Sequence, residues 1–583
     1  MQPLDWTIII AYFAGSAAVG AYYARRAGRD TGEFFLSGRS MPWWLAGTSM
    51  VATTFAADTP LAVTELVAKN GIAGNWLWWN FVFGGVLTVF FFARLWRRSG
   101  IMTDVEFAEL RYAGRPAAFL RGFRAVYLGL FLNCIIMGWV NLAMASVLQG
   151  MFGVPPEQVM WYVVGALAVT SVYSAMSGLW GVTVTDALQF VLAMAGCIVL
   201  ADAVLDLPQV GGLAGLRSAL PEWAFRFTPS VGGDGLNAGG AFALTVSAFL
   251  AFVGVQWWSS WYPGSEPGGG GFVAQRMMSA KDERHSLFAT LWFIVAHYCL
   301  RPWPWIIVGL ASLVLYPELG PDEKRLGYVY AMRDHLPAGL KGLLVAGFFA
   351  AYMSTVATQL NWGSSYIVND LFRRFIRPAA DERSLVRVSR ITTLVIMAVS
   401  VAVTSVIGTI SGAWTFIIEA SAGLGLVLIL RWYWWRINAW SEITAMVVPL
   451  GIYYLLTVFG PVPFPDSLFL IVGGTTLAWL AATFLTPPEP AEKLDAFFTR
   501  VRPGGPGWRA VAARLPQVRA DGHFGASFVC WGLGIVLIYA ALFGTGELLF
   551  GSGVTGALLF LLSALCGAGI VFILKRQEIP LFE

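Results

Sequence analysis

Long apolar segments constrain this chain more than any other feature of its sequence. A helix of about 20 mostly apolar residues is long enough to cross the hydrocarbon core of a bilayer, and the 583-residue chain contains fifteen such segments. They cover residues 4–24, 43–69, 73–95, 120–150, 157–176, 183–205, 240–262, 286–315, 339–369, 389–409, 412–433, 441–460, 466–486, 524–546 and 554–574. Only 12% of the residues are charged, against about 25% in soluble proteins. We therefore predict an all-α polytopic membrane protein with the lipid bilayer as its surroundings.

Basic residues in the connecting loops predict the orientation. If the N-terminus is outside and the fifteen segments alternate, 30 of the 38 Lys and Arg residues fall on the inside and 7 on the outside, with Arg301 inside a span. Cytoplasmic loops carry the excess of Lys and Arg in membrane proteins. We expect a multi-pass protein of the cell inner (plasma) membrane with its N-terminus outside and its C-terminus in the cytoplasm.

The segment Trp43–Lys69 contains a carboxylate, a hydroxyl and a proline at its middle, in Asp58-Thr59-Pro60. Proline lacks a backbone donor and disrupts the preceding turn, and a carboxylate at membrane depth is tolerated only where it faces protein or water. One interpretation is a kinked structural helix with a satisfied Asp58. The other is a broken helix whose freed carbonyls and side chains hold an ion or a solute.

A second unusual segment ends in aromatic residues and glycines. The span 240–262 finishes with four aromatic side chains, and Pro263-Gly264 and Pro267 with four glycines follow. An ordinary helix end with an interfacial aromatic belt explains this pattern. Alternatively, the aromatic residues form a wall of a binding site, next to a flexible gate. That wall would consist of Trp257, Trp258, Trp261 and Tyr262.

The two unusual segments fall at matching places in two halves of the chain. Each opens a set of five segments, and such interrupted pairs are typical of transporters built from inverted repeats. The predicted domains are an N-terminal extra transmembrane helix and cytoplasmic loop (1–42), the first five-helix repeat (43–205), an extracellular loop (206–239), the second five-helix repeat (240–433), two extra helices (434–486), a cytoplasmic linker (487–523), and two C-terminal helices with a tail (524–583).

Polar residues within the apolar segments supply candidates for an ion site. Ser354 and Thr355 are adjacent in a segment rich in hydroxyls, which can simply bond to their own helix. They can also combine with carbonyls of an unwound helix to bind sodium. Asp186 lies early in its span and either guides a cation out or pairs locally. Arg301 either pairs with a carboxylate or contacts an anionic group of a solute.

The motifs of residues 30–440 resemble the sodium:solute symporter family, which includes sodium/glucose and sodium/proline cotransporters. FFLSGRSMPWWLAGTSMVATTFAAD resembles the signature of its first core helix, and FFAAYMSTVATQLNWGSSYIVNDLFRRF resembles its eighth. SGLWGVTVTDALQF, VAQRMMSAKD and RWYWWRINAWSE match further family patterns in the same order. The resemblance implies a LeuT-like inverted five-helix repeat core, here with one extra N-terminal and about four extra C-terminal transmembrane helices.

The resemblance also implies positions for the bound species. The backbone carbonyls of Ala52, Phe55 and Ala351 and the hydroxyls of Ser354 and Thr355 are expected to bind sodium. Asp186 is expected to lie near the ion's exit path, and Asp58 and Thr59 match positions that line the solute site of sugar-transporting members. Those members have Glu-Gln where this chain has Asp58-Thr59, and the run WYPGSEPGGGG is inserted relative to the usual pattern. The resemblance therefore does not identify the solute of this chain.

From these observations we expect a sodium-coupled symporter of a small polar solute, with a sugar or polyol favoured over an amino acid. Proton coupling through a carboxylate is the nearest alternative. A nutrient sensor is a weaker one, because the linker 487–523 is too short for a signalling domain. We expect no enzyme activity, because catalytic side chains do not cluster, and no nucleotide drive, because GxxxxGK[ST] is absent. We expect no nucleic-acid partner and no obligatory protein partner.

Overall fold

The structure is a computed structural model that describes residues 1–231, 243–244, 246–321, 323–408 and 410–577. The predictions for the loop 206–239, the start of the span 240–262, the loop after the span 286–315, the boundary near residue 410 and the end of the C-terminal tail fall partly outside these residues. The described residues are almost entirely helical, which confirms the all-α prediction. Two short parallel strands, β1 (Ser230–Val231) and β2 (Ala243–Leu244), pair with each other.

The helices follow the predicted apolar segments closely. In the first half they are α1 (Pro3–Ala27), α2 (Thr31–Leu36), α3 (Trp43–Thr53), α4 (Asp58–Asn70), α5 (Trp76–Trp79), α6 (Val82–Leu87), α7 (Ala93–Ser99), α8 (Phe107–Arg111), α9 (Gly114–Val126), α10 (Asn133–Phe152), α11 (Pro156–Leu205), α12 (Gly212–Ala219), α13 (Val246–Phe249), α14 (Trp257–Ser259) and α15 (Gly271–Ser279). In the second half they are α16 (Glu283–Val295), α17 (Pro302–Leu315), α18 (Leu326–His335), α19 (Leu340–Ser365), α20 (Glu382–Thr404), α21 (Ile410–Ala420), α22 (Leu424–Tyr433), α23 (Ala439–Val458), α24 (Asp466–Leu485), α25 (Ala491–Val501), α26 (Arg509–Ala512), α27 (Phe524–Phe550) and α28 (Gly553–Arg576).

Short turns of other helix types join several of these helices. Turns of 3-10 helix cover Ser37–Arg39, Ile72–Asn75, Glu222–Phe225 and Pro506–Trp508. Turns of π-helix cover Thr88–Phe92, Tyr127–Leu132, Leu250–Gln256, Ala296–Leu300 and Tyr366–Ile376. The long α11 contains Gly178 with a φ of 56°, a left-handed conformation that glycine adopts readily, and this kink divides it into the two predicted spans.

Twelve helices among the described residues are long and apolar enough to cross a membrane, or thirteen if the bent pair α21 and α22 forms one span. The fifteen predicted spans include two more, 43–69 and 240–262. The first is divided into α3 and α4, and the described part of the second is divided into α13, a π-helical turn and α14. Both segments that the sequence marks as interrupted are therefore broken in the structure, and the bent pair α21 and α22 adds a third interruption that the sequence analysis did not identify.

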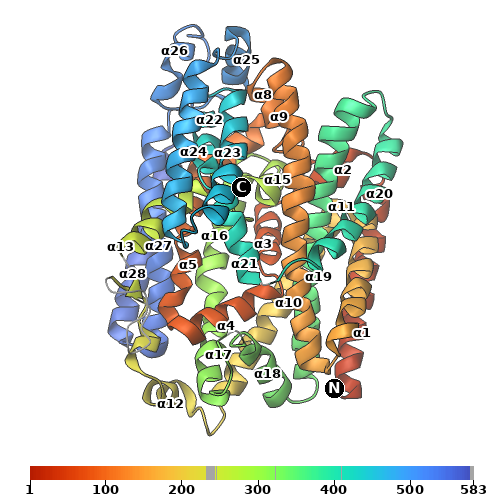
Figure 1. Ribbon diagram of the computed structural model, residues 1–583, viewed down its shortest axis with the longest axis vertical. Helices are drawn as coiled ribbons and strands as arrows, with labels where there is room; N and C mark the ends of the chain where they lie inside the picture. The colour runs from red at the N-terminus through yellow and green to blue at the C-terminus, as the bar shows by residue number, and fades with distance from the viewer. Residues whose placement is uncertain (232–242, 245, 322, 409, 578–583) are drawn as a thin grey trace.

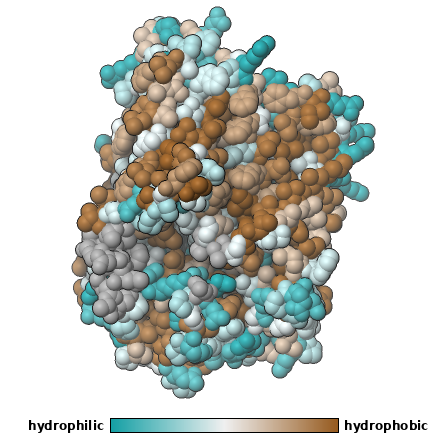
Figure 2. All heavy atoms as spheres, viewed as in Figure 1, coloured by the Kyte–Doolittle hydropathy of each residue, from teal (hydrophilic) through white to brown (hydrophobic). Residues whose placement is uncertain are grey.

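The long helices run side by side between two polar ends. Figure 1 shows α12, α18 and the N-terminus at one end of the molecule and α8, α25 and α26 at the other. Loops that the sequence assigns to the same side thus lie together. In Figure 2, hydrophobic residues cover the broad middle of one face, and hydrophilic residues gather toward the top and bottom. This distribution fits a multi-pass membrane protein.

The broken segment lies at the centre of the bundle. Helix α3 packs against α16, α11 and α19, and α4 packs against α17 and α10. The helices α23, α24, α27 and α28 follow α22 and pair as α23 with α24 and α27 with α28. The interruption between α3 and α4 is therefore surrounded by helices from both predicted repeats.

Candidate functional site

The chain leaves the helical conformation between α3 and α4. Helix α3 ends at Thr53 and α4 begins at Asp58, so that residues 54–57 form the break. Pro60 is the third residue of α4, where its missing N–H has no intrahelical acceptor to lose. The break thus falls just before the proline, and it leaves carbonyl groups of the last turn of α3 without a continuing helix.

Helix α19 places hydroxyls against this break. The Thr355 hydroxyl lies 2.9 Å from the Thr53 carbonyl oxygen and 3.2 Å from the Ala351 carbonyl oxygen, so it bridges α3 and α19. The Ala52 carbonyl accepts a hydrogen bond from the Phe55 amide at 3.0 Å. The structure therefore brings the predicted sodium-site residues of α19 to the end of α3. Neutral hydroxyl and carbonyl oxygens at an unwound helix are the groups that hold sodium in such transporters.

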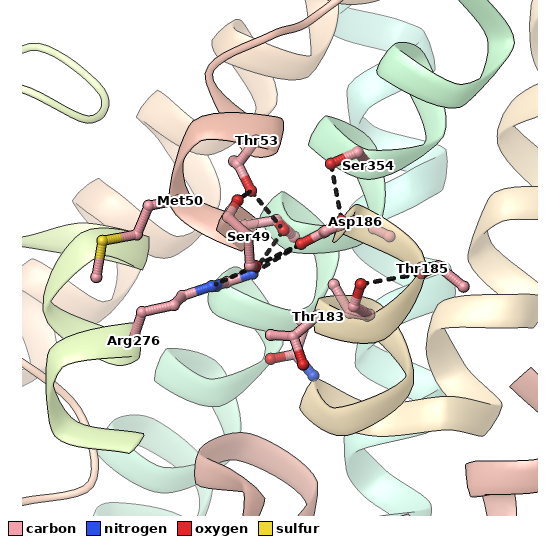
Figure 3. Close-up of polar contacts among 12 residues, drawn as sticks. Ser49, Met50, Thr53, Thr183, Thr185, Asp186, Arg276 and Ser354 are labelled. Carbon is pink, nitrogen blue, oxygen red and sulfur yellow. Dashed lines mark hydrogen bonds and ion pairs between the residues drawn. The ribbon is translucent and has the colours of Figure 1, made fainter. Parts of the chain in front are cut away.

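The predicted exit-path residue, Asp186 on α11, is in direct contact with this region (Figure 3). Ser354 donates to one Asp186 carboxylate oxygen at 2.7 Å, and Ser49 of α3 donates to the other at 2.5 Å. The Arg276 guanidinium of α15 lies 3.7 Å from Asp186 Oδ2. It also donates to the Thr358 hydroxyl at 2.8 Å. Asp186 and a predicted sodium ligand thus belong to one buried polar network.

Arg276 is a member of this network that the sequence does not identify. Its segment follows the glycine run and reads as an inside loop, yet the side chain is fully buried. The signal available in the sequence is a lone arginine in VAQRMMSAKD, among apolar residues. Buried arginines need partners, so its position predicts a carboxylate nearby, but only the fold identifies it as Asp186.

A cavity with an empty volume of about 780 Å³ lies beside the break. Its lining includes Asp58, Thr59 and Tyr262 from the predicted solute site. The further lining residues that the sequence did not assign to it include polar side chains (His297, Gln359), aromatic ones (Trp78, Phe81, Trp139, Tyr298, Trp414) and aliphatic ones (Ala62, Val63, Leu66, Ile136, Val140). Thr355 and Thr53 also line it, so the cavity reaches the hydroxyl that bridges α3 and α19. The predicted solute and ion positions are therefore contiguous.

Three of the predicted aromatic residues do not line the cavity. The indole N–H groups of Trp257 and Trp258 donate to the carbonyls of Val253 and Gly254, one turn back in their own helix, at 2.9 and 2.6 Å. Trp261 is only 2% exposed and packs in the core. Trp261 and Tyr262 both follow the end of α14, and of these two residues Tyr262 is the one that lines the cavity.

Asp58 and Arg301 give the cavity its charge. Asp58 is 3% exposed, and its Oδ1 has no hydrogen-bond partner in the part of the chain that the structure describes. Arg301 donates to the Thr54 hydroxyl at 3.1 Å and contacts a ring nitrogen of His297 at 2.8 Å. Among the described residues, no carboxylate lies within 4.0 Å of its guanidinium. Arg301 therefore does not pair with Glu65 or with another described carboxylate of a span.

Two glutamates within the predicted spans, Glu65 and Glu419, have other partners. Glu65 pairs with Lys69 one turn along α4 at 2.6 Å, and Glu419 accepts a hydrogen bond from Ser467. Arg301 and His297 belong to one π-helical turn and its end, in HYCLRPWPW. An arginine in an apolar span signals function, but its direction into the cavity follows only from the fold.

A model of the sodium:solute symporter family matches residues 34–448, which is more than half of the chain. Sodium/glucose cotransporter 4 of Danio rerio is 26% identical over 79% of this chain and 73% of its own length. A sodium/mannose cotransporter of Bos taurus is 26% identical over 77% of this chain and 78% of its own length. Sodium/myo-inositol cotransporter 2 of Oryctolagus cuniculus is 26% identical over 77% of this chain and 69% of its own length. These matches confirm the resemblance found in the sequence. The matched proteins are transporters rather than enzymes.

Among solved structures, the chain is similar to a Na+-coupled sialic acid symporter in a substrate-bound, outward-open state. The TM-score is 0.66 at 18% sequence identity, covering 84% of this chain and 99% of that one. A likeness at this level of identity speaks to the fold alone. It confirms the predicted LeuT-like fold.

Proposed function

Because the chain belongs to the sodium:solute symporter family, we propose that it imports a small polar solute by coupling the entry of the solute to that of sodium. The observation that carries this proposal is the position of the solute cavity. It reaches Thr355, whose hydroxyl bridges the interrupted α3 and the continuous α19. An ion held at this junction alters the geometry of the break that forms one wall of the cavity.

The proposed sodium site consists of oxygen atoms from α3 and α19 and from the break after α3. Its members are the carbonyls of Ala52, Phe55 and Ala351 and the hydroxyls of Ser354 and Thr355. Asp186 lies next to it through the Ser354 hydroxyl, and we propose that it receives the ion on the exit path. A charged carboxylate that accepts a hydrogen bond from one of the proposed ligands lowers the energy of a cation as the cation leaves the neutral oxygens.

The proposed solute site consists of Asp58, Thr59 and Tyr262, together with Arg301 and the aromatic walls of the cavity. The free Asp58 oxygen accepts a hydrogen bond, a guanidinium donates, and aromatic faces stack on apolar ring faces. This combination suits a sugar or another polyol. The names of the similar proteins, which include glucose, mannose and myo-inositol cotransporters, support that class.

Coupling requires that sodium bind the solute-competent states more tightly than the others, since a ligand with equal affinity for all states shifts none of them. The membrane potential adds about 2.3 kcal/mol per charge for each 100 mV. We propose that residues 43–205 and 240–433 act as the two repeats that move relative to each other. We also propose that the N-terminus is outside and the C-terminus cytoplasmic, from the distribution of Lys and Arg.

An inward sodium gradient should drive accumulation of the solute into proteoliposomes that contain the purified protein. Candidate solutes are first selected by a sodium-dependent rise in melting temperature across sugars, polyols, amino acids, nucleosides and carboxylates. Uptake is then compared with sodium replaced by choline at fixed pH, with and without an inward proton gradient. Equal uptake in choline contradicts sodium coupling, and uptake restored by protons alone indicates a proton-coupled symporter.

Asp58→Asn should raise the KM for the solute by about tenfold or more, because hydrogen bonds to a charged acceptor contribute about 1.5–3 kcal/mol. Sodium binding measured without solute should change little, since Asp58 has no contact with the Ser354–Asp186 network. Glu65→Gln on the same helix is the matched control, because this residue pairs with Lys69 away from the cavity. An unchanged KM in Asp58→Asn would remove this residue from the solute site.

A further inference from the structure

The loop between α14 and α15 carries a carboxylate that the solute cavity does not use. Glu266 is 3% exposed, and neither of its carboxylate oxygens has a hydrogen-bond partner among the described residues. The backbone amides of Gly264 and of Glu266 itself lie near the carboxylate. Among the described residues no Lys, Arg or His nitrogen lies within 4.0 Å of it. An ionised carboxylate in such a place costs several kcal/mol unless a cation compensates it.

Glu266 lines a small cavity adjacent to the solute cavity. The empty volume is about 230 Å³, less than a third of the 780 Å³ of the solute cavity. Ser265 lines both, so only the loop around this residue separates them. The remaining walls combine two further hydroxyl-bearing residues, Thr88 and Thr290, with apolar side chains. The cavity is therefore small enough for a single ion, and three hydroxyl-bearing residues and a glutamate are among the residues that line it.

The threonine hydroxyls in this cavity are available as ligands but not as donors to Glu266. The Thr88 hydroxyl donates to the Gly84 carbonyl at 3.0 Å, and the Thr290 hydroxyl donates to the Ser286 carbonyl at 2.9 Å. Each hydrogen is thus committed to its own helix, and the oxygen lone pairs remain free. A carboxylate and hydroxyl oxygens without donors form a ligand set for a cation.

The glycine run after Pro267 fits tightly around the carboxylate. A Cβ on Gly271 would lie 2.6 Å from Glu266 Oε1, and a Cβ on Gly270 would lie 3.2 Å from Glu266 Cβ. Gly271 has a φ of +55°, which side-chain-bearing residues rarely adopt. The inserted sequence therefore folds specifically around Glu266, which is not expected of a loop that only connects two helices.

The charged groups on the far side of the glycines do not neutralise Glu266. The Gly271 amide donates to Asp104 Oδ2 at 3.2 Å. The nearest base to Asp104 is Arg124, at 3.9 Å, and Arg124 also pairs with Glu442 at 3.0 Å. A second carboxylate thus lies behind the loop, and its arginine is shared. Arg431 also pairs with Glu442, at 2.9 Å, so this cluster of two carboxylates and two arginines is neutral as a whole and leaves the charge of Glu266 without a counter-charge.

We propose that the Glu266 carboxylate and the hydroxyls of Thr88, Ser265 and Thr290 bind a second monovalent cation, sodium, next to the solute cavity. The choice of sodium rests on the proposed coupling ion, whereas the site itself rests on the geometry of the loop. Because Ser265 belongs to both cavities, an ion at this site fixes the loop that closes the solute cavity on this side. Solute and second ion then stabilise each other's binding.

Equilibrium binding of radioactive sodium to the purified full-length protein, at constant pH and without solute, tests this site. We expect the wild-type protein to bind two sodium ions, and both Glu266→Gln and the Ser354→Ala/Thr355→Ala pair to bind one. Glu157→Gln, which changes an exposed glutamate, should bind two. Monodispersity and melting temperature without sodium establish that each variant is folded.

Thr88→Val combined with Thr290→Val provides a second measurement that keeps the carboxylate and the side-chain shape. It should weaken one of the two sodium sites by about tenfold or more, since each hydroxyl removed is a ligand to a charge. Equal sodium stoichiometry in wild type and Glu266→Gln overturns the second site. A wild type that binds one sodium ion and releases a Glu266-dependent proton overturns it as well, in favour of a proton. A wild type that binds no sodium and shows no sodium-driven uptake overturns the proposed coupling itself.

Discussion

Asp186→Asn should destabilise the folded protein by about 3–5 kcal/mol, because it leaves a buried guanidinium without its counter-charge. Among the described residues, Asp186 is the one carboxylate within 4.0 Å of Arg276. The other acceptors of Arg276 are neutral: the Ser49 hydroxyl, the Gln275 amide oxygen and the Thr358 hydroxyl. Neutral acceptors satisfy hydrogen bonds but do not replace the Coulombic attraction that offsets desolvation of the cation.

The loss is measured as the fall in melting temperature of the purified protein, in one detergent and without sodium. Arg276→Met should cost less than Asp186→Asn, because the carboxylate keeps hydrogen bonds from Ser49 and Ser354. The double variant should recover most of the loss, since replacing both members of a buried pair is often nearly neutral. If the double variant is as unstable as Asp186→Asn alone, the pairing contributes nothing and the carboxylate acts through its hydroxyl contacts.

The pair Asp186 and Arg276 also shows which residues of the site can be predicted from the sequence. Asp186 is conspicuous because carboxylates within apolar spans are rare and functional. Arg276 is not, because its segment reads as a polar loop after a glycine run, and the fold instead packs α15 against α3 and α19. Whether a segment after an interrupted helix turns back into the bundle depends on distant packing, which local composition does not encode.

The aromatic residues before that loop illustrate a second limit. Successive residues of a helix point about 100° apart, so Trp257, Trp258 and Trp261 cannot all face the same space as Tyr262. A sequence shows that they are close together but not which of them lies beyond the last helical turn. Helix α14 ends at Ser259, so Trp261 and Tyr262 both lie beyond it, and the course of the chain there places Tyr262 at the cavity and Trp261 in the core.

The fold itself is largely predictable from this sequence, for a physical reason. Apolar length is a strong signal, because a spanning helix must satisfy all its backbone hydrogen bonds internally. Two of the broken segments, 43–69 and 240–262, carry or directly precede prolines, glycines or a carboxylate that indicate the break. The predicted ion ligands benefit from the same signal, since the break and the adjacent hydroxyls of α19 are both visible in the sequence.

Ser354→Ala combined with Thr355→Ala should raise the sodium concentration for half-maximal uptake by about tenfold for each hydroxyl. The physical basis is the loss of two ligands to a charge, at about 1.5 kcal/mol or more each, where 1.4 kcal/mol corresponds to a factor of ten. Thr355→Ala also removes the bridge from α19 to the Thr53 carbonyl at 2.9 Å. The two single variants should therefore differ, with Thr355→Ala loosening the break and Ser354→Ala freeing one oxygen of Asp186.

Sodium dependence of uptake and direct sodium binding are both measured, because a change of solute affinity alone would also shift uptake. Ser365→Ala on the same helix is the matched control: its buried hydroxyl donates to the Trp362 carbonyl at 2.6 Å, within α19. If the pair of substitutions leaves sodium dependence unchanged while Glu266→Gln abolishes it, the coupling ion occupies the glycine-loop site alone. In that case the hydroxyls at the break serve only to join α3 to α19. The interrupted helix then couples to the ion through the cavity wall around Ser265, which lines both cavities.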